Sequence, residues 1–187
     1  MSRVKPIVAS LAVAAGVTVG LAAAAPQYPR DIVVTADYKT ENVSMTAKVT
    51  IHVDQLMREA NHERLITALR QGGYPSFLPL LRRLPVLGYV QIDTRKVDLR
   101  YARSQATDEG ERLILVTDGP LFFVMGGEVD PKERGGYALS IVDLQLDANG
   151  AGSGTMSAAA RVKPDADGNV VVDDYAENPI AVTVVGK

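Results

Sequence analysis

The sequence contains no cysteine and no tryptophan, and only two histidines and three phenylalanines occur among its 187 residues. Without cysteine the chain has no disulfide framework, no thiolate nucleophile, no Cys-ligated zinc or iron–sulfur cluster and no lipid-modified cysteine. Two histidines cannot build a three-His metal centre. The formal net charge of −2 gives no basic surface for a phosphate backbone, so nucleic acid is not an expected partner.

The N-terminal segment has the pattern of a secretory signal peptide. A short basic start precedes an uncharged run over residues 7–25, which is rich in alanine and ends in small residues. We expect cleavage after Ala24, which gives a signal peptide of residues 1–24 and one periplasmic or secreted domain of residues 25–187. The alternative is an uncleaved anchor, because about 20 apolar residues can span a bilayer. After cleavage no membrane span is expected.

The remaining chain reads mainly as β-strands. Apolar and polar residues alternate with a period of two through residues 44–53 and more weakly through 31–38, which predicts an antiparallel hairpin over 31–53. The Asn-Gly and Asp-Gly pairs at 149–150 and 167–168 are typical of tight hairpin turns. Seven further strands are predicted at residues 86–92, 97–103, 112–118, 137–146, 155–163, 169–175 and 180–185.

Residues 54–84 break this alternation and predict a helical insert. Asp54 can cap a short helical turn, a helix over 62–71 should stop at Gly72-Gly73, and Ser76 can cap a second helix over 77–83. Pro79 would then lie in the first turn of that helix, where proline is tolerated.

These elements define the predicted fold class as mainly β with one helical insert, or α+β. We expect an antiparallel β-meander of about nine strands that forms a barrel or a sandwich, with the insert after the second strand. The short connections between strands leave no room for the crossover helices of a parallel sheet.

No catalytic motif stands out, and the sequence predicts no catalytic residue, no cofactor and no metal. Glu59, His62 and Glu63 have helical spacing and can share one face, but such residues near the exposed start of a surface helix are commonly solvated. His52 lies on the polar face of its strand, where we expect it to be exposed. No Gly-x-Ser-x-Gly nucleophile elbow and no phosphate-binding glycine loop is present.

The first candidate ligand-binding residues lie on two predicted strands. Strict alternation places Arg100 on the face opposite Leu99 and Tyr101. Residues 113–116 are apolar on both faces and lead to Asp118, so this strand should be central in the sheet. If the two strands pair, Asp118 or Thr117 can meet an arginine, either in a structural ion pair or at a ligand site.

The other candidates lie in two irregular stretches. Residues 119–136 carry glycine pairs and the apolar side chains Phe122, Phe123 and Met125, which predict either a tenth strand or a contact surface at one end of the barrel. Tyr175 lies in a polar corner over residues 173–179.

Several of these segments together resemble a known group of sequences. The motifs at 100–103, 110–120, 141–146, 150–160 and 174–179 resemble a group of predicted-secreted bacterial proteins of unknown function, across roughly residues 45–185. The resemblance implies one exported domain, and it carries no activity.

Three classes of function remain open. The first is non-catalytic binding of an apolar or amphipathic ligand, at a barrel mouth or at the 119–136 loop. The second is an interaction domain for an envelope or secreted protein, without a small ligand. The third is an enzyme whose site the sequence does not display. An enclosed apolar cavity would favour the first class, and a filled interior with an apolar surface patch would favour the second.

Overall fold

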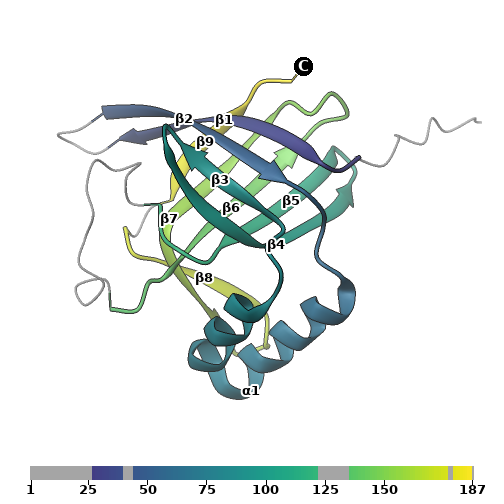
Figure 1. Cartoon of the computed structure of the whole chain (residues 1–187), viewed down its shortest axis with the longest axis vertical. Helices are drawn as coiled ribbons and strands as arrows, with labels where there is room; N and C mark the ends of the chain where they lie inside the picture. The colour runs from purple at the N-terminus through teal and green to yellow at the C-terminus, as the bar shows by residue number, and fades with distance from the viewer. Residues whose placement is uncertain (1–26, 40–43, 122–134, 177–178, 187) are drawn as a thin grey trace, which may run out of the picture.

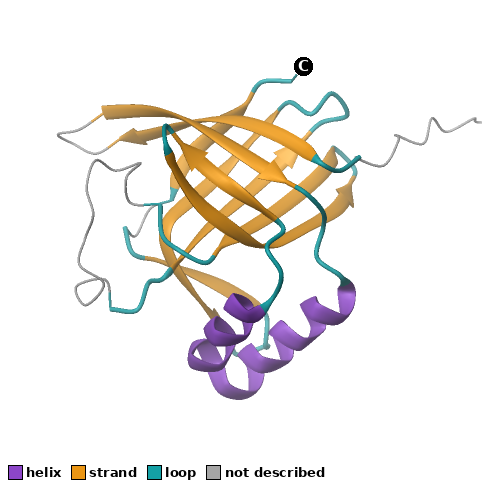
Figure 2. Cartoon of the chain, viewed as in Figure 1, coloured by secondary structure: helices purple, strands orange, loops and turns teal. Residues whose placement is uncertain are grey.

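The computed structural model describes residues 27–39, 44–121, 135–176 and 179–186. It consists of nine antiparallel strands and one helical element (Figures 1 and 2). In chain order the elements are β1 (Arg30–Lys39), β2 (Ser44–Val53), α1 (Glu59–Arg83), β3 (Gly88–Ile92), β4 (Arg95–Thr107), β5 (Gly110–Thr117), β6 (Leu139–Leu146), β7 (Gly152–Pro164), β8 (Val170–Asp174) and β9 (Ile180–Val184).

Eight of the strands close into a barrel. The sheet order is β6-β5-β4-β3-β2-β1-β9-β7-β8, and the additional pairing of β6 with β7 closes the ring. The first half of β7 pairs with β9, and its second half pairs with β8, which lies outside the ring. The predicted antiparallel meander of nine strands is confirmed, and the closed ring decides for a barrel against a sandwich.

The barrel interior is filled by apolar side chains. Every second residue of a strand points inward, so Val49 and Ile51 of β2 and Leu113 and Leu115 of β5 are fully buried in one continuous core. Leu121 enters this core just after β5, and its N–H donates to the Ala158 carbonyl at 2.6 Å. The alternation of apolar and polar residues in the sequence therefore reflects the packing of every second side chain in this interior.

A bulge in β4 changes which way one candidate residue points. The register shifts between Leu99 and Tyr101, so Leu99 packs in the barrel interior whereas Tyr101 packs on the outer wall. The prediction that both residues share one face was wrong, because an extra residue in one strand inverts the alternation after it.

A second bulge turns β7 away from the barrel. The register of β6 and β7 shifts between Leu139 and Ile141, and the end of β7 then pairs with β8 alone among the described strands. The turn of this β7–β8 hairpin is closed by Asp165, whose Oδ1 accepts the N–H groups of Asp167 and Asn169 at 2.9 and 2.8 Å. Its Asp-Gly pair thus forms the hairpin turn that the sequence predicts.

The helical insert is a single element with a kink. Gly73 has φ 63° and ψ −162°, so the helix stops at the predicted glycine pair and resumes in a new direction. Two predictions were wrong: residues 54–57 form no helical turn, and the second segment begins before Ser76. Pro79 therefore lies beyond the first turn.

The insert covers part of the outer barrel wall and forms a second core. Leu65, Leu69 and Leu81 of α1 are fully buried against Val116 and Ile141 of the wall. In Figure 1 the insert lies below the barrel, on the same side as β8. Within the described ranges, no helix is long and apolar enough to cross a membrane.

Candidate functional site

A groove lies on the outer wall of the barrel, between α1 and β8. It is a groove of about 760 Å³ whose floor is the outer face of β4, β5, β6 and β7. His62, Ile66 and Phe77 of α1 line the groove, and Val170 and Val172 of β8 also line it. Its size falls within the range of about 300–1,000 Å³ that is typical of small-ligand sites.

The strand register orders the groove floor into rows, each running across neighbouring strands. Gln105 of β4 lies opposite Arg112 of β5, and this polar row is the one nearest the β4–β5 turn. Arg103 lies opposite Ile114 in the next row, and Ile114 in turn lies opposite Asp143 of β6. The floor is therefore polar at the end near this turn.

The following row is apolar. Tyr101 lies opposite Val116, and Val116 lies opposite Ile141. Val116 and Ile141 are each only 6% exposed because α1 packs over them with Phe77. Polarity thus decreases along the strands, from the polar row toward the part of the wall that the insert covers.

One side of the groove carries exposed valines. Val170 and Val172 of β8 are 44% and 43% exposed, and both line the groove. Val171, between them, is 38% exposed and does not line it, because successive side chains of a strand point to opposite faces. Val170 and Val172 thus add exposed apolar surface to this side of the groove.

Two arginines occupy the polar end. Arg112 donates from Nε and Nη2 to the two oxygens of Asp143, at 3.0 and 2.6 Å, and this bidentate pair raises the pKa of the guanidinium. Arg103 donates from Nη1 to Glu59 Oε1 at 3.1 Å, and the Glu59 side chain is 64% exposed. Both ion pairs are partly accessible to solvent, but Arg112 is held by two hydrogen bonds and Arg103 by one to Glu59.

A His–Tyr contact lies between the polar and apolar parts. The Tyr101 hydroxyl is 3.0 Å from His62 Nδ1, and both side chains line the groove. Burial lowers the pKa of His62, so the ring is neutral near pH 7 and Nδ1 can accept the hydroxyl proton. Burial also raises the pKa of Tyr101. The prediction that His62 is exposed was wrong, since its ring contacts the barrel wall.

Arg100 and Asp118 form the predicted ion pair, but the pair lies outside the groove. Arg100 donates from Nε to Asp118 Oδ2 at 2.7 Å, from Nη2 to Asp98 Oδ2 at 3.1 Å and from Nη1 to the Leu84 carbonyl at 2.8 Å. These contacts join the end of the insert to β4 and the end of β5. Neither Arg100 nor Asp118 lines the groove, and their contacts describe a structural clamp.

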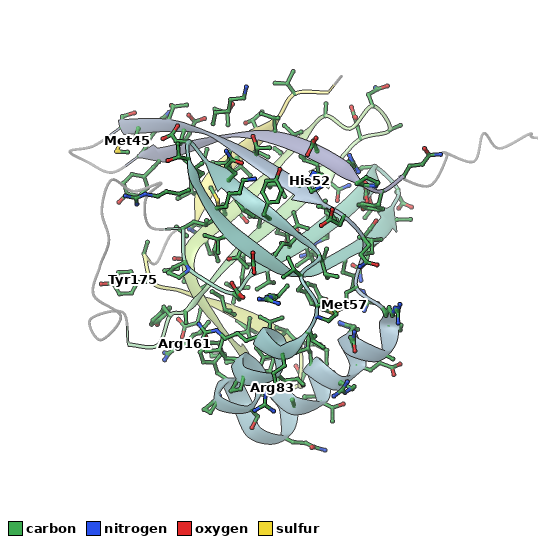
Figure 3. The ribbon with its side chains drawn as sticks, in the orientation of Figure 1. Met45, His52, Met57, Arg83, Arg161 and Tyr175 are labelled. Carbon is green, nitrogen blue, oxygen red and sulfur yellow. The ribbon has the colours of Figure 1, made fainter. Side chains whose placement is uncertain are left out.

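The remaining candidates do not gather at the groove. Tyr175 is 37% exposed and its ring meets that of Tyr137 edge-on at 5.6 Å; Figure 3 shows it at the edge of the molecule. Phe122, Phe123 and Met125 lie outside the described residues. Of the predicted binding residues, the structure places Tyr101 in the groove.

His52 lies elsewhere, on the outer wall of β2 (Figure 3). Its Nδ1 is 2.6 Å from Asp31 and its Nε2 is 3.0 Å from Asp54, and the hydrogen bond to Asp31 is the main cause of its raised pKa. The ring also stacks on Tyr89 at 5.0 Å. Its side chain is 25% exposed, so the ring is less open to solvent than expected.

The polar groups of the groove form no metal cluster in the part of the chain that the structure describes. Among the residues that the structure describes, no group of three or more acidic or histidine side chains is placed to hold a metal ion. The groove instead combines a wide apolar floor with a few convergent polar groups, which is the usual composition of a ligand site.

Sequence reasoning missed the apolar residues of the groove floor. Ile114 and Val116 alternate with the interior residues Leu113 and Leu115, and two apolar faces of this kind predict a central strand. In a closed barrel every strand is central, so the second apolar face needs a cover outside the barrel. Apolar residues on both faces of β5 were the signal in the sequence that could have indicated the groove.

No family model, curated protein or solved structure matches the chain. The resemblance to predicted-secreted bacterial proteins stays a prediction, and function has to be argued from the groove.

Proposed function

We propose that this protein is a non-catalytic binding domain whose outer groove holds an apolar or amphipathic ligand. The observation that carries the proposal is a groove of about 760 Å³ with apolar residues contributed by both the barrel wall and the insert. Burial of apolar ligand surface contributes about 25 cal/mol for each Å² removed from water. A ligand that covers the partly exposed Ile114 and the exposed Val170 and Val172 would gain this term.

The site that we propose differs from the expected barrel mouth. The interior is filled by the side chains of the main core, and Leu121 is fully buried within it. A ligand inside the barrel would have to displace well-packed side chains, at a cost of several kcal/mol. The outer groove needs no such displacement.

Two neighbouring valines provide a matched test. Val172→Asp places a charge on the groove wall, and Val171→Asp places the same charge on the opposite face of the same strand. Both side chains are exposed, so both variants should fold. A neutral apolar dye, N-phenyl-1-naphthylamine, should bind the wild type and Val171→Asp alike and Val172→Asp at least about five-fold more weakly. Equal binding by both variants would contradict the groove as the site.

A second candidate function is protein interaction at the β8 edge. Within the described sheet β8 pairs with β7 alone. It carries three exposed valines and has neither the lysine nor the proline that often protects an edge strand. A filled interior with an apolar surface patch also fits this class. Sedimentation of the wild type and Val171→Lys tests the simplest partner, a second copy: concentration-dependent association that the variant abolishes supports it, and a monomer at all concentrations argues against it.

We also propose that the protein is exported, with residues 1–24 removed. The support is the sequence pattern alone, since residues 1–26 lie outside the described structure. Mass spectrometry of the protein from a bacterial periplasm should give a chain that begins at Ala25. An intact N-terminus in the membrane fraction would contradict cleavage.

A further inference from the structure

We propose that the ligand is an amphipathic acid, with a carboxylate or phosphate headgroup at Arg103 and Arg112 and an apolar chain along the accessible apolar lining of the groove. This inference rests on the proposed binding function and adds the chemistry of the ligand. It depends on the direction of the polarity gradient and on which polar groups in the groove still have hydrogen-bonding capacity.

The two arginines are placed to act on one headgroup. Arg103 lies opposite Ile114, two residues beyond Arg112, so the arginines are diagonal neighbours on paired strands. Diagonal neighbours lie about 7–8 Å apart at the backbone, a span that long side chains can close around a small anion. Both side chains line the groove, and they are 27% and 48% exposed.

Both guanidinium groups retain donors. Arg112 uses Nε and Nη2 for Asp143, and in the described part of the chain its Nη1 has no hydrogen-bond partner. Arg103 uses Nη1 for the exposed Glu59, and an exposed ion pair of this kind contributes little because solvent screens it. An incoming anion can therefore bind Arg103 at little cost, while Asp143 holds Arg112 in a fixed orientation.

The carboxylates of the groove offer little to a cationic ligand. Both oxygens of Asp143 accept from Arg112, and Asp173 accepts from Arg161 at 2.8 Å and from the Tyr137 hydroxyl at 3.2 Å. One oxygen of Asp174 accepts a backbone N–H, and the other is buried, with no hydrogen-bond partner among the described residues, so a ligand in the groove does not reach it. The carboxylates that solvent reaches are thus already paired with arginines, whereas the arginines keep donors for an anion.

The decrease in polarity along the groove floor indicates where the apolar chain of the ligand lies. From the arginines the floor continues through Ile114 to Val116 and Ile141, and Ile66 and Phe77 of α1 line the same stretch. A single apolar chain attached to the headgroup would cover the accessible part of this surface, the partly exposed Ile114 and Ile66 and the exposed Val172 beside them. A ligand without such a chain would leave Val172 in contact with water.

Four decyl compounds separate the headgroup from the chain: decanoate, decyl phosphate, decanol and decyltrimethylammonium. Binding is measured by displacement of N-phenyl-1-naphthylamine and by calorimetry. We expect at least one acid to bind about ten-fold or more tightly than decanol, since a charge-assisted hydrogen bond is worth about 1.5–3 kcal/mol. Decyltrimethylammonium should bind no more tightly than decanol. The stronger of the two acids identifies carboxylate or phosphate as the headgroup.

Arg103→Gln and Arg112→Gln should each reduce the affinity for that acid toward that of decanol and leave the affinity for decanol unchanged. Arg64→Gln is the control of equal charge, because Arg64 is an exposed residue of α1 that does not line the groove. Equal binding of acids and decanol, or tighter binding of the cation, would overturn the headgroup while the groove stands. If none of the four compounds binds, the proposed function itself fails.

Discussion

Replacing Leu65 with aspartate tests whether the insert is an integral part of the fold. Leu65 is fully buried in the second core, between α1 and the outer wall of the barrel. Its removal from that core forfeits about 2 kcal/mol of apolar burial. A buried carboxylate without a partner adds at least about 3 kcal/mol. The sum of about 5 kcal/mol matches the lower end of the total stability of a typical domain, about 5–15 kcal/mol.

Thermal unfolding followed by circular dichroism measures this effect. At about 2–4 °C for each kcal/mol in a domain of this size, Leu65→Asp should lower the Tm by about 10–20 °C or prevent folding. Thr67→Asp is the matched control, because Thr67 is exposed on the same helix. His62→Ala should cost about 1 kcal/mol or less, since it loses a single hydrogen bond at the groove. Equal Tm values for Leu65→Asp and Thr67→Asp would refute the second core as described.

Three further predictions follow from the polar contacts. NMR titration should place the pKa of His52 above its ordinary value, and Asp31→Asn should return it toward that value. Because the folded-state pKa of His52 is raised, its contact with Asp31 stabilises the protein fully below the unfolded-state pKa of 6.5. This stabilisation is lost as the pH rises through the folded-state pKa. Asp31→Asn should therefore reduce the dependence of the free energy of unfolding on pH in this range. Arg100→Met should lower stability by about 1–3 kcal/mol without changing dye binding, and a loss of binding at unchanged Tm would instead make Arg100 a ligand residue. Ultraviolet titration should show Tyr28 ionising at a pKa of about 12, because it is buried beside Glu111, and Glu111→Gln should lower that pKa; an unchanged value would contradict the contact.

The strands could be predicted because successive residues of a barrel strand face the interior and the outside in turn. Inward residues such as Val49 and Ile51 must be apolar, and their outward neighbours face water, which produces a period of two. The turns could be predicted because Asp165 and the glycine at 168, with φ 80°, meet local requirements of the backbone. Both signals depend on residues that are close together in the chain.

The choice between a barrel and a sandwich could not be predicted, because it depends on pairings between distant residues. Apolar and polar residues alternate in the same way in both architectures. Closure here requires the first half of β7 to pair with β6 and β9, whereas its second half leaves the barrel and pairs with β8. The bulges in β4 and β7 carry no distinct residue pattern. The position of Tyr101 on the outer wall therefore became visible only in the structure.

The same logic explains why the groove lies outside a barrel whose interior is full. Ile114 and Val116 make the outer face of β5 apolar, and α1 covers Val116 fully but leaves Ile114 partly exposed. Val172 extends this uncovered strip on β8, at 43% exposure. Exposed apolar surface of this kind has no role in a domain that already has two filled cores, and it raises the risk of aggregation. A ligand that covers the strip would remove that risk, which supports the proposal that the outer wall binds a ligand.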